Sequence, residues 1–429
     1  MKLCGFTEFK SGLLGEKLGH SFSPQIHSCF ADYSYTLFEE SPESAESFLR
    51  SGGFDGINVT IPYKKLAFSV CDVTSDVAQK IGSVNTVIRR DNKLYGFNTD
   101  YYGFTYLVKK AGFNVSKGKT LVLGSGGSSV MACAALRDLG AKDVVVISRS
   151  GENNYSNIYD LHSDASFIVN TTPIGMYPKN GFAAVDLEHF DSCLGVIDII
   201  FNPSKTKLLL DAERLGIPCI NGLPMLVAQA KQAFELFTSQ ISVDGLSSEA
   251  SSLDGLSVAE IIDGITAQIE FMTKNIVLIG MPGCGKSTVG AVLATKLSRD
   301  FVDIDLEIEK RINMSICDFF AEYGEPAFRK IESEILDEFA RKSGLIIATG
   351  GGCVTREENY PYLKQNGIVF WIKRDISKLA TNGRPLSQNN SLFKMYEERK
   401  PLYEKFCDHV IENHENQLET AEKIKEKIL

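Results

Sequence analysis

The sequence has 429 residues, which exceeds one compact core and predicts two or three domains. With 44% hydrophobic and 23% charged residues, its composition is that of an ordinary globular protein and not of a disordered or fibrous one. The net charge of −9 argues against a nucleic-acid-binding surface, which would require clustered Lys and Arg. Anionic ligands must therefore be met by local basic residues.

The ten cysteines are scattered, with no C-x-x-C pair and no zinc-ligand spacing, which predicts thiols in a reducing compartment. Apolar runs are of strand length, far below the roughly 18 residues that a transmembrane helix needs. The start, MKLCGFTEFK, lacks the basic and apolar regions of a signal peptide. We therefore expect a cytoplasmic protein that binds neither membrane nor nucleic acid. The sequence gives no prediction of oligomeric state.

Four short polar motifs open the chain, and each ends a strand-like stretch: GEKLGHSFSP (15–24), GINVTIPYK (56–64), GSVNT (82–86) and GFNTD (96–100). Ser21 and Ser23 alternate, so both hydroxyls can face one ligand carboxylate; the alternative for Ser23 is an N-cap before Pro24. Lys64 follows a predicted strand-to-helix turn. Together with Asp100 it could pass a proton to an alkoxide, whereas a surface pair would contribute nothing measurable.

Apolar runs then alternate with helical patterns, which predicts a parallel sheet covered by helices. The predicted strands are 120–124, 143–148, 166–170 and 196–200. After the first of them, Gly124, Gly126 and Gly127 precede an alanine-rich helix, the setting of a dinucleotide pyrophosphate turn. Ser129 replaces the third glycine of G-x-G-x-x-G, so a simple tight turn is the alternative.

The next strand ends in Ser148, Arg149 and Ser150, where an NAD enzyme would place Asp or Glu on the ribose hydroxyls. A guanidinium flanked by two serines suits a 2′-phosphate instead. The sequence therefore favours NADP.

Residues 239–256, SQISVDGLSSEASSLDGL, are rich in Ser, Gly and acidic residues and predict a linker. Ser257 and Glu260 then form a capping box, and isoleucines at helical spacing predict a short helix docked between two modules. A second alternating series, at 275–280, 301–305, 345–349 and 368–373, predicts a second α/β domain.

The segment GMPGCGKST (280–288) fits the phosphate-binding loop G-x-x-x-x-G-K-[ST] between a predicted strand and helix. Its glycines let backbone N–H groups surround phosphates, and the helix N-terminus favours negative charge. Lys286 would reach the β- and γ-phosphates, and the Ser287 hydroxyl would bind magnesium. The alternative, a glycine turn with a solvated lysine, does not account for the strand and helix around it.

Downstream residues indicate the second substrate. Asp303 and Asp305 lie two apart at a predicted strand end, so one could serve magnesium and the other an acceptor hydroxyl; a solvated strand end is the alternative. Arg329 and Glu332 lie three apart on a predicted helix, which could hold the guanidinium for a ligand carboxylate or form an exposed salt bridge. Three glycines, 350–352, would allow close approach to a ligand or form a sharp turn.

A predicted mobile lid contains GRPLS (383–387), and ERKPLY (398–403) adds another arginine. In order, GMPGCGKST, D-x-D, FR-x-x-E, ATGGG, RPL and R-x-P-L-Y resemble shikimate kinase over nearly all of 274–429. The resemblance implies a P-loop kinase that uses ATP and Mg²⁺, with Asp305 accepting the hydrogen of the attacking hydroxyl. It implies that shikimate is bound by Asp305, Arg329, Gly351, Gly352 and Arg399; that ATP is bound by Gly283, Cys284, Gly285, Lys286, Ser287, Thr288 and Arg384; and that magnesium is served by Ser287 and Asp303. Many family members have an Arg shortly before RPL that contacts adenine, whereas this chain has Ala380, which leaves nucleotide preference open.

The N-terminal motifs, with NTTPIGM (170–176), FNPSKTKLL (201–209) and NGLPMLVAQA (221–230), resemble shikimate dehydrogenase across residues 3 to about 240. The resemblance implies a two-subdomain enzyme with a Rossmann-like NADP domain and Lys64 and Asp100 as its catalytic pair. It implies that the substrate contacts Ser21, Ser23, Thr60, Lys64, Asn85, Asp100 and Gln229, and that NADP contacts Gly124, Gly126, Gly127, Ser148, Arg149, Ser150, Met176 and Gly222. Quinate-preferring relatives tend to alter the second serine of the Ser-x-Ser pair, so Ser23 favours shikimate.

The predicted division is a dehydrogenase-like module (1–256), a connecting helix (257–273) and a P-loop kinase module (274–429). Within the first, 1–101 and 222–256 form the substrate subdomain with its trailing linker, and 102–221 the NADP-binding subdomain. The predicted function is successive reduction of 3-dehydroshikimate and phosphorylation of shikimate, in aromatic amino acid biosynthesis. Two alternatives are a module that senses a ligand without turnover, and a quinate dehydrogenase joined to a kinase for another hydroxy acid.

Overall fold

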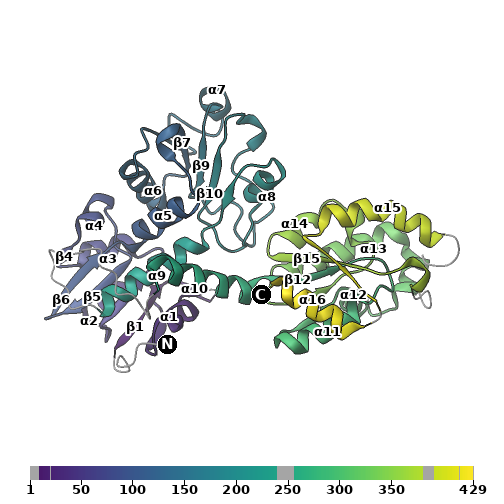
Figure 1. Cartoon of the computed structure of the whole chain (residues 1–429). Coiled ribbons are helices and arrows are strands. Elements are labelled where there is room, and N and C mark those ends of the chain that lie inside the picture. Colours follow the sequence, from purple (N-terminus) through teal and green to yellow (C-terminus); the bar gives the residue numbers. More distant parts are fainter. Residues whose placement is uncertain (1–8, 20, 239–255, 380–390, 415, 429) are drawn as a thin grey trace. The chain divides into compact units, whose positions relative to one another are not determined.

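The computed structural model describes residues 9–19, 21–238, 256–379, 391–414 and 416–428. In this part of the chain, no helix is both long and apolar enough to cross a membrane. The chain divides into two compact units (Figure 1). The first unit contains Met1–Ile174, Ala183–Phe201 and Asp211–Ile269, and the second contains Gly175–Phe182, Asn202–Leu210 and Glu270–Leu429. The predicted linker, 239–256, lies almost wholly outside the described residues.

A six-stranded mixed sheet with the order β2-β1-β3-β5-β6-β4 begins the first unit. Its strands are β1 (Lys10–Gly15), β2 (Ser34–Glu39), β3 (Gly56–Val59), β4 (Val73–Thr74), β5 (Thr86–Arg90) and β6 (Lys93–Phe97), and its helices are α1 (Ser23–Phe30), α2 (Ala45–Ser51), α3 (Lys64–Val70) and α4 (Asp76–Ile81). β1 and β3 are parallel, whereas β5 runs antiparallel to β3 and β6. The ends of β1, β3 and β6 therefore meet the start of β5 at one edge. All four polar motifs follow or precede a strand at that edge.

A five-stranded parallel sheet with the order β11-β10-β9-β7-β8 forms the rest of the first unit. Its strands are β7 (Lys119–Leu123), β8 (Asp143–Ile147), β9 (Phe167–Asn170), β10 (Gly195–Asp198) and β11 (Cys219–Ile220). The helices and short 3₁₀ turns are α5 (Thr99–Lys110), η1 (Val115–Lys117), α6 (Gly127–Asp138), α7 (Ile158–His162), η2 (Leu187–His189) and α8 (Lys207–Arg214). The chain goes from β7 to β8 on one side and then crosses to β9 on the other side of β7. This reversal is a topological switch point, the place where open α/β sheets bind ligands.

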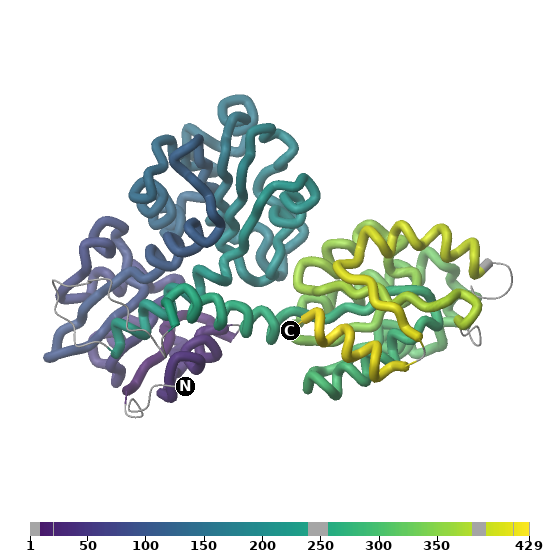
Figure 2. The backbone as a smooth tube through the Cα atoms, in the orientation of Figure 1, coloured from purple at the N-terminus to yellow at the C-terminus, as the bar shows by residue number. Residues whose placement is uncertain are grey.

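Two further helices complete the first unit. The backbone returns from the second sheet through α9 (Leu223–Thr238), which packs on α5 and α1 (Figure 2). α10 (Val258–Thr273) begins with the predicted capping box: Ser257 N–H donates to Glu260 Oε2 (2.7 Å), and Glu260 N–H donates to Ser257 Oγ (3.2 Å). Its buried face packs in one cluster with α1 and α9 through Ile261, Ile262, Ile265 and Ile269. The helix predicted as a connection is thus, as far as Ile269, a packed part of the first unit.

The second unit is built on a five-stranded parallel sheet with the order β13-β14-β12-β15-β16. Its strands are β12 (Asn275–Ile279), β13 (Phe301–Asp303), β14 (Ile346–Ala348), β15 (Gly367–Lys373) and β16 (His409–Glu412). Its helices and 3₁₀ turns are α11 (Lys286–Leu297), α12 (Ile304–Ile312), α13 (Ile316–Ala340), η3 (Cys353–Thr355), α14 (Asn359–Lys364), η4 (Ile376–Lys378), α15 (Ser391–Phe406) and α16 (Gln417–Ile428). Every residue of the central strand β12 is buried, as expected for a parallel strand covered on both faces.

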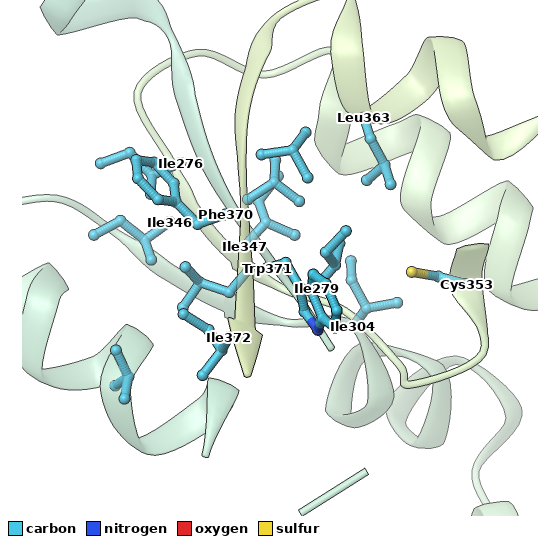
Figure 3. Close-up of a cluster of buried hydrophobic side chains, with 14 of the residues drawn as sticks. Ile276, Ile279, Ile304, Ile346, Ile347, Cys353, Leu363, Phe370, Trp371 and Ile372 are labelled. Atoms are coloured by element: carbon cyan, nitrogen blue, oxygen red, sulfur yellow. The ribbon is translucent and has the colours of Figure 1, made fainter. Parts of the chain in front are cut away.

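The core of the second unit is an apolar cluster around this sheet. Ile276 and Ile279 of β12 lie among Phe370, Trp371 and Ile372 of β15 (Figure 3). The predicted fold class, an α/β protein with a Rossmann-like domain and a P-loop domain on a parallel sheet, is confirmed.

Candidate active sites

Lys64 and Asp100 form an ion pair in the first unit. Lys64 is the first residue of α3, and Asp100 lies in the first turn of α5, which Asn98 caps. Lys64 Nζ lies 2.6 Å from Asp100 Oδ2, and the two side chains are 28% and 19% exposed. The pair is therefore partly enclosed and still open to a ligand. An ammonium held in this way by a carboxylate can stabilise and protonate an alkoxide.

The two predicted serines lie together beside the start of α1. Ser21 Oγ donates to Ser23 Oγ (3.2 Å) and accepts from Ser23 N–H (3.3 Å). Phe22 occupies the N-cap position of α1, so Ser23 does not serve as the cap. Thr60 follows β3, and its N–H donates to the carbonyl of Leu14 at the end of β1 (2.9 Å).

Asn85 and Gln229 are brought together by a threonine that the sequence analysis did not single out. Thr99 Oγ1 accepts from Asn85 Nδ2 (3.1 Å) and donates to Gln229 Oε1 (3.4 Å). Thr99 N–H also donates to Asn85 Oδ1 (2.6 Å). Asn85, Thr99 and Gln229 are all buried, so their side chains are fixed before a ligand arrives.

The glycine turn lies at the switch point after β7. Gly124 has φ +107°, a conformation that favours glycine, and an added Cβ would touch Thr171 and Thr172. Gly126 is the N-cap of α6 and Gly127 its first residue, and an added Cβ at either position would meet open space. Backbone N–H groups at this helix end can bind a pyrophosphate.

Ser148, Arg149 and Ser150 directly follow β8, as predicted. Asparagine side chains build the loop after them: Asn154 Nδ2 donates to the carbonyl of Gly151 (3.2 Å), and Asn157 Nδ2 donates to that of Glu152 (2.9 Å). This hydrogen bonding holds the segment that carries Arg149.

Two further residues predicted to contact NADP, Met176 and Gly222, come after β9 and β11 of the same sheet. An added Cβ at Gly222 would come within 1.9 Å of the carbonyl oxygen of Ile199, so close packing accounts for this glycine. Met176 belongs to the 175–182 segment of the second unit. Their roles at the cofactor stay predictions.

In the second unit, the phosphate-binding loop joins β12 to α11. Gly283 and Gly285 have φ values of +81° and +101°, which only glycine adopts readily. The Lys286 side chain is buried across the loop, where Nζ donates to the carbonyls of Gly280 (2.9 Å) and Met281 (3.1 Å). The alternative of a solvated lysine is therefore wrong.

A cavity of about 510 Å³ opens beside this loop. The predicted residues on its wall are Gly283, Gly285, Lys286, Ser287, Thr288, Asp305, Arg329, Gly351, Gly352 and Arg399. Cys284 is fully buried and Asp303 caps α12, and neither is among the described lining residues. Arg384 lies outside the described residues.

Asp303 and Asp305 differ from the prediction in their backbone. They do not point to the same side of one strand, because β13 ends at Asp303 and α12 begins at Ile304. Asp303 Oδ1 instead accepts the N–H of Asp305 (3.0 Å), an N-cap that orients the first turn of α12. The Asp305 carboxyl thus reaches the cavity from a helix.

Burial, followed by the nearby charge of Glu332, raises the pKa of Asp305 to about 6. Burial also raises the pKa of Glu332. Lys286 and Arg329 oppose the shift of Asp305, and Asp303 adds to it. Asp305 is therefore a carboxylate near neutral pH with an unusually strong tendency to take up a proton.

Arg329 is held by two carboxylates on α13. Its Nη1 donates to Glu332 Oε2 (2.7 Å), and its Nη2 donates to Glu325 Oε1 (2.9 Å). The side chains of Arg329 and Glu332 are 10% and 0% exposed, which excludes the exposed salt bridge. Gly352 allows this arrangement, because an added Cβ would lie 2.1 Å from Arg329 Nη2.

The glycine run 350–352 thus accommodates the protein's own side chains. An added Cβ at Gly350 would lie 2.3 Å from Glu332 Oε1 and 2.8 Å from Asp305 Oδ1. The carbonyl of Gly351 accepts from Arg399 Nη1 (3.1 Å) and from the buried Tyr403 hydroxyl (2.5 Å).

Sequence analysis missed other residues on the cavity wall, including Phe320, Cys317 and Arg374. Arg374 also lines a neighbouring cavity of about 760 Å³ at the ends of β15 and β16. Its position directly after β15, the strand beside β12, was the available signal, because ligands gather at the carboxyl ends of such strands.

The first unit is therefore a two-subdomain α/β oxidoreductase with a dinucleotide turn, and the second is a P-loop kinase. Residues 282–429 match the family model of shikimate kinase, and residues 13–87 match that of the shikimate dehydrogenase substrate binding domain. Shikimate dehydrogenase (NADP(+)) of Clostridium perfringens strain 13 is 37% identical over 253 residues, covering 54% of this chain and 93% of the relative. The protein of the same name from Clostridium beijerinckii is 37% identical over 246 residues, covering 53% and 90%.

Solved structures of shikimate dehydrogenases also resemble the first part of the chain. Shikimate dehydrogenase 1 of Peptoclostridium difficile has a TM-score of 0.52 and 33% identity, covering 61% of this chain and 97% of that one. A chorismate mutase/shikimate 5-dehydrogenase fusion protein of Clostridium acetobutylicum has a TM-score of 0.53 and 34% identity, covering 61% and 96%. The chain belongs to the shikimate dehydrogenase family and also carries a shikimate kinase domain. It is a bifunctional enzyme, an oxidoreductase joined to a phosphotransferase.

Proposed function

We propose that the first unit reduces 3-dehydroshikimate to shikimate with NADPH at the edge where Lys64 meets Asp100. The 2.6 Å contact between these side chains is the observation that carries the proposal. The relatives described as shikimate dehydrogenase (NADP(+)) support it. So does a shikimate 5-dehydrogenase from Thermus thermophilus in complex with NADP(H) and shikimate, at 28% identity and a TM-score of 0.51.

In this proposal the chain's residues orient the ring and stabilise charge. NADPH supplies the hydride when bound. Lys64 donates a hydrogen bond to the C3 oxygen and protonates it as negative charge develops, while Asp100 keeps the ammonium in position. Ser21 and Ser23 bind the ring carboxylate. Thr60, Asn85 and Gln229 bind the ring hydroxyls.

The dinucleotide fits the turn after β7. The open space at Gly126 and Gly127 leaves room for a pyrophosphate at the N-terminus of α6. Arg149, with Ser148 and Ser150, binds the 2′-phosphate in this proposal.

We further propose that the second unit transfers the γ-phosphoryl group of ATP to the 3-hydroxyl of shikimate. Asp305 accepts the hydroxyl hydrogen, Arg329 and Arg399 bind the ring carboxylate, and Lys286 stabilises the transferring phosphate. Mg²⁺ neutralises phosphate charge when bound, and the oxygen donors Ser287 and Asp303 suit it. Ser287 lies on the cavity wall, and Asp303 caps α12 through Oδ1.

Two assays on the purified chain test the proposal. We expect NADPH oxidation with 3-dehydroshikimate to exceed that with dehydroquinate, and ATP consumption with shikimate to exceed that with quinate. Preference for dehydroquinate and quinate would indicate the quinate alternative. Ligand binding without turnover in either assay would indicate a sensing module.

The described cysteines form no disulfides, in keeping with the proposed reducing, cytoplasmic location.

A further inference from the structure

A chain of hydrogen bonds runs through the first unit beneath the proposed substrate edge. Tyr35 on β2 donates from its hydroxyl to Asn58 Oδ1 on β3 (2.9 Å). Asn58 Nδ2 donates to Thr86 Oγ1 on β5 (3.1 Å). Thr86 Oγ1 in turn lies 3.2 Å from Asn85 Oδ1 and 3.1 Å from Thr99 Oγ1. The chain therefore reaches the cluster that contains Gln229.

At its other end, Tyr35 interacts with the Ser23 hydroxyl, which opposes the rise that burial causes in the pKa of Tyr35. Ser23 and Asn58 are 8% and 5% exposed, so the tyrosine hydroxyl joins two buried groups. Tyr35 thus connects Ser23, at the start of α1, to the amide of Asn58 on β3 and the hydroxyl of Thr86 on β5.

The ring of Tyr35 is itself held in place. His27 of α1 stacks on it, with ring centroids 4.0 Å apart and an interplanar angle of 17°. His27 is 1% exposed, and its Nδ1 is bonded to the hydroxyl of Tyr33. Burial lowers the pKa of His27 to about 3, so the imidazole is neutral across the working range of pH.

We propose that Tyr35 is a positioning residue of the dehydrogenase site, which fixes Ser23 relative to Asn58 and Asn85 and so sets the distance between the carboxylate-binding and hydroxyl-binding groups. The proposal rests on the function proposed above for Ser23 and Asn85. Tyr35 acts through these residues and takes no part in the chemical step. It lies outside all the motifs on which the family resemblance was based.

Tyr35→Phe in the full chain tests this role, because it removes the hydroxyl and keeps the stacked ring. We expect the KM for 3-dehydroshikimate to rise roughly fivefold to thirtyfold, since about 1 to 2 kcal/mol is typical of one lost hydrogen bond. We expect kcat to change less than about threefold and the KM for NADPH to stay constant. Tyr106→Phe is the matched control, because its hydroxyl donates to Asp263 Oδ1 (2.7 Å) and lies outside the Tyr35–Asn58 hydrogen-bond chain.

A double-mutant cycle separates positioning from general destabilisation. If Tyr35 acts through Ser23, the Ser23→Ala, Tyr35→Phe double variant has a KM close to that of Ser23→Ala alone. Additive effects would overturn the proposal. So would an unchanged KM in Tyr35→Phe, or equal losses in kcat, both KM values and thermal stability. A wild-type chain that does not oxidise NADPH with 3-dehydroshikimate would reject the proposed function and this inference together.

Discussion

Lys64 and Lys65 are adjacent lysines with different surroundings, which makes them a matched pair for testing catalysis. Lys64 meets Asp100, whereas the Lys65 side chain is exposed. We expect Lys64→Ala to lower the kcat of reduction by roughly 10²- to 10⁴-fold, because the developing alkoxide loses its proton donor. Lys65→Ala should retain activity within about twofold. Comparable losses in the two variants, measured by NADPH oxidation, would contradict the assignment.

The raised pKa of Asp305 predicts an acid limit for the kinase. Asp305 must be ionised to accept the hydroxyl hydrogen, so we expect kcat/KM to fall as the pH drops through about 6. Glu332→Gln removes a negative charge that raises the pKa of Asp305, so the fall in kcat/KM should occur at lower pH in this variant. Glu325→Gln is the control, because Glu325 pairs with Arg329 at a partly exposed position. If kcat/KM of Glu332→Gln fell at the same pH as that of the wild type, this electrostatic coupling would be contradicted.

Sequence could predict which residue types gather in the sites, because each motif ends at a strand or begins a helix. It could not predict how single side chains are used. The glycines at 350 and 352 are predicted to allow close approach of a ligand or to form a sharp turn. They line the cavity and also lie against the side chains of Glu332 and Arg329. That contact depends on how α13 packs against the turn after β14, which local periodicity does not encode.

The buried isoleucine face of α10 predicts that this helix stabilises the dehydrogenase unit. Ile262 is fully buried in the cluster with α1 and α9, whereas Met272 on the same helix is 48% exposed. Ile262→Ala leaves a cavity that costs roughly 2 to 5 kcal/mol, so we expect the midpoint temperature of dehydrogenase inactivation to fall by roughly 4 to 20 °C. Met272→Ala should change the midpoint by less than about 2 °C. The measurement is residual NADPH oxidation after heating. An unchanged midpoint in Ile262→Ala would show that α10 does not support the dehydrogenase.

The strands and helices were predictable wherever apolar periodicity was strong. NIVLI, DVVVI and the capping box at Ser257 gave elements within a residue or two of β12, β8 and α10. The pairing of β1 with β2, which carries Tyr35 toward Ser23, joins residues about 20 positions apart, and such register is set by tertiary packing. The packing of α10 on α1 spans more than 200 positions, so its spacing revealed a helix and not its partner.

The two enzymes can be tested for independence with their own inactive variants. Lys64→Ala should lose reduction and keep phosphorylation, and Lys286→Ala should do the reverse. An equimolar mixture of the two should convert 3-dehydroshikimate to shikimate 3-phosphate at the wild-type steady rate, because shikimate diffuses freely between sites. Each variant alone is the control. In a coupled assay, a lag before shikimate 3-phosphate formation that is much shorter in the wild type than in the mixture would instead demonstrate direct transfer of shikimate.

The join between the enzymes is very short. α10 ends at Thr273 and β12 begins at Asn275, so Lys274 alone separates the last helix associated with the dehydrogenase from the central strand of the kinase. A protease site engineered into 239–255 would therefore cut the dehydrogenase itself and leave α10 covalently attached to the kinase. The nicked halves would still co-purify, held by the buried isoleucines, and the protein would behave as a split enzyme whose smaller fragment brings a whole kinase with it.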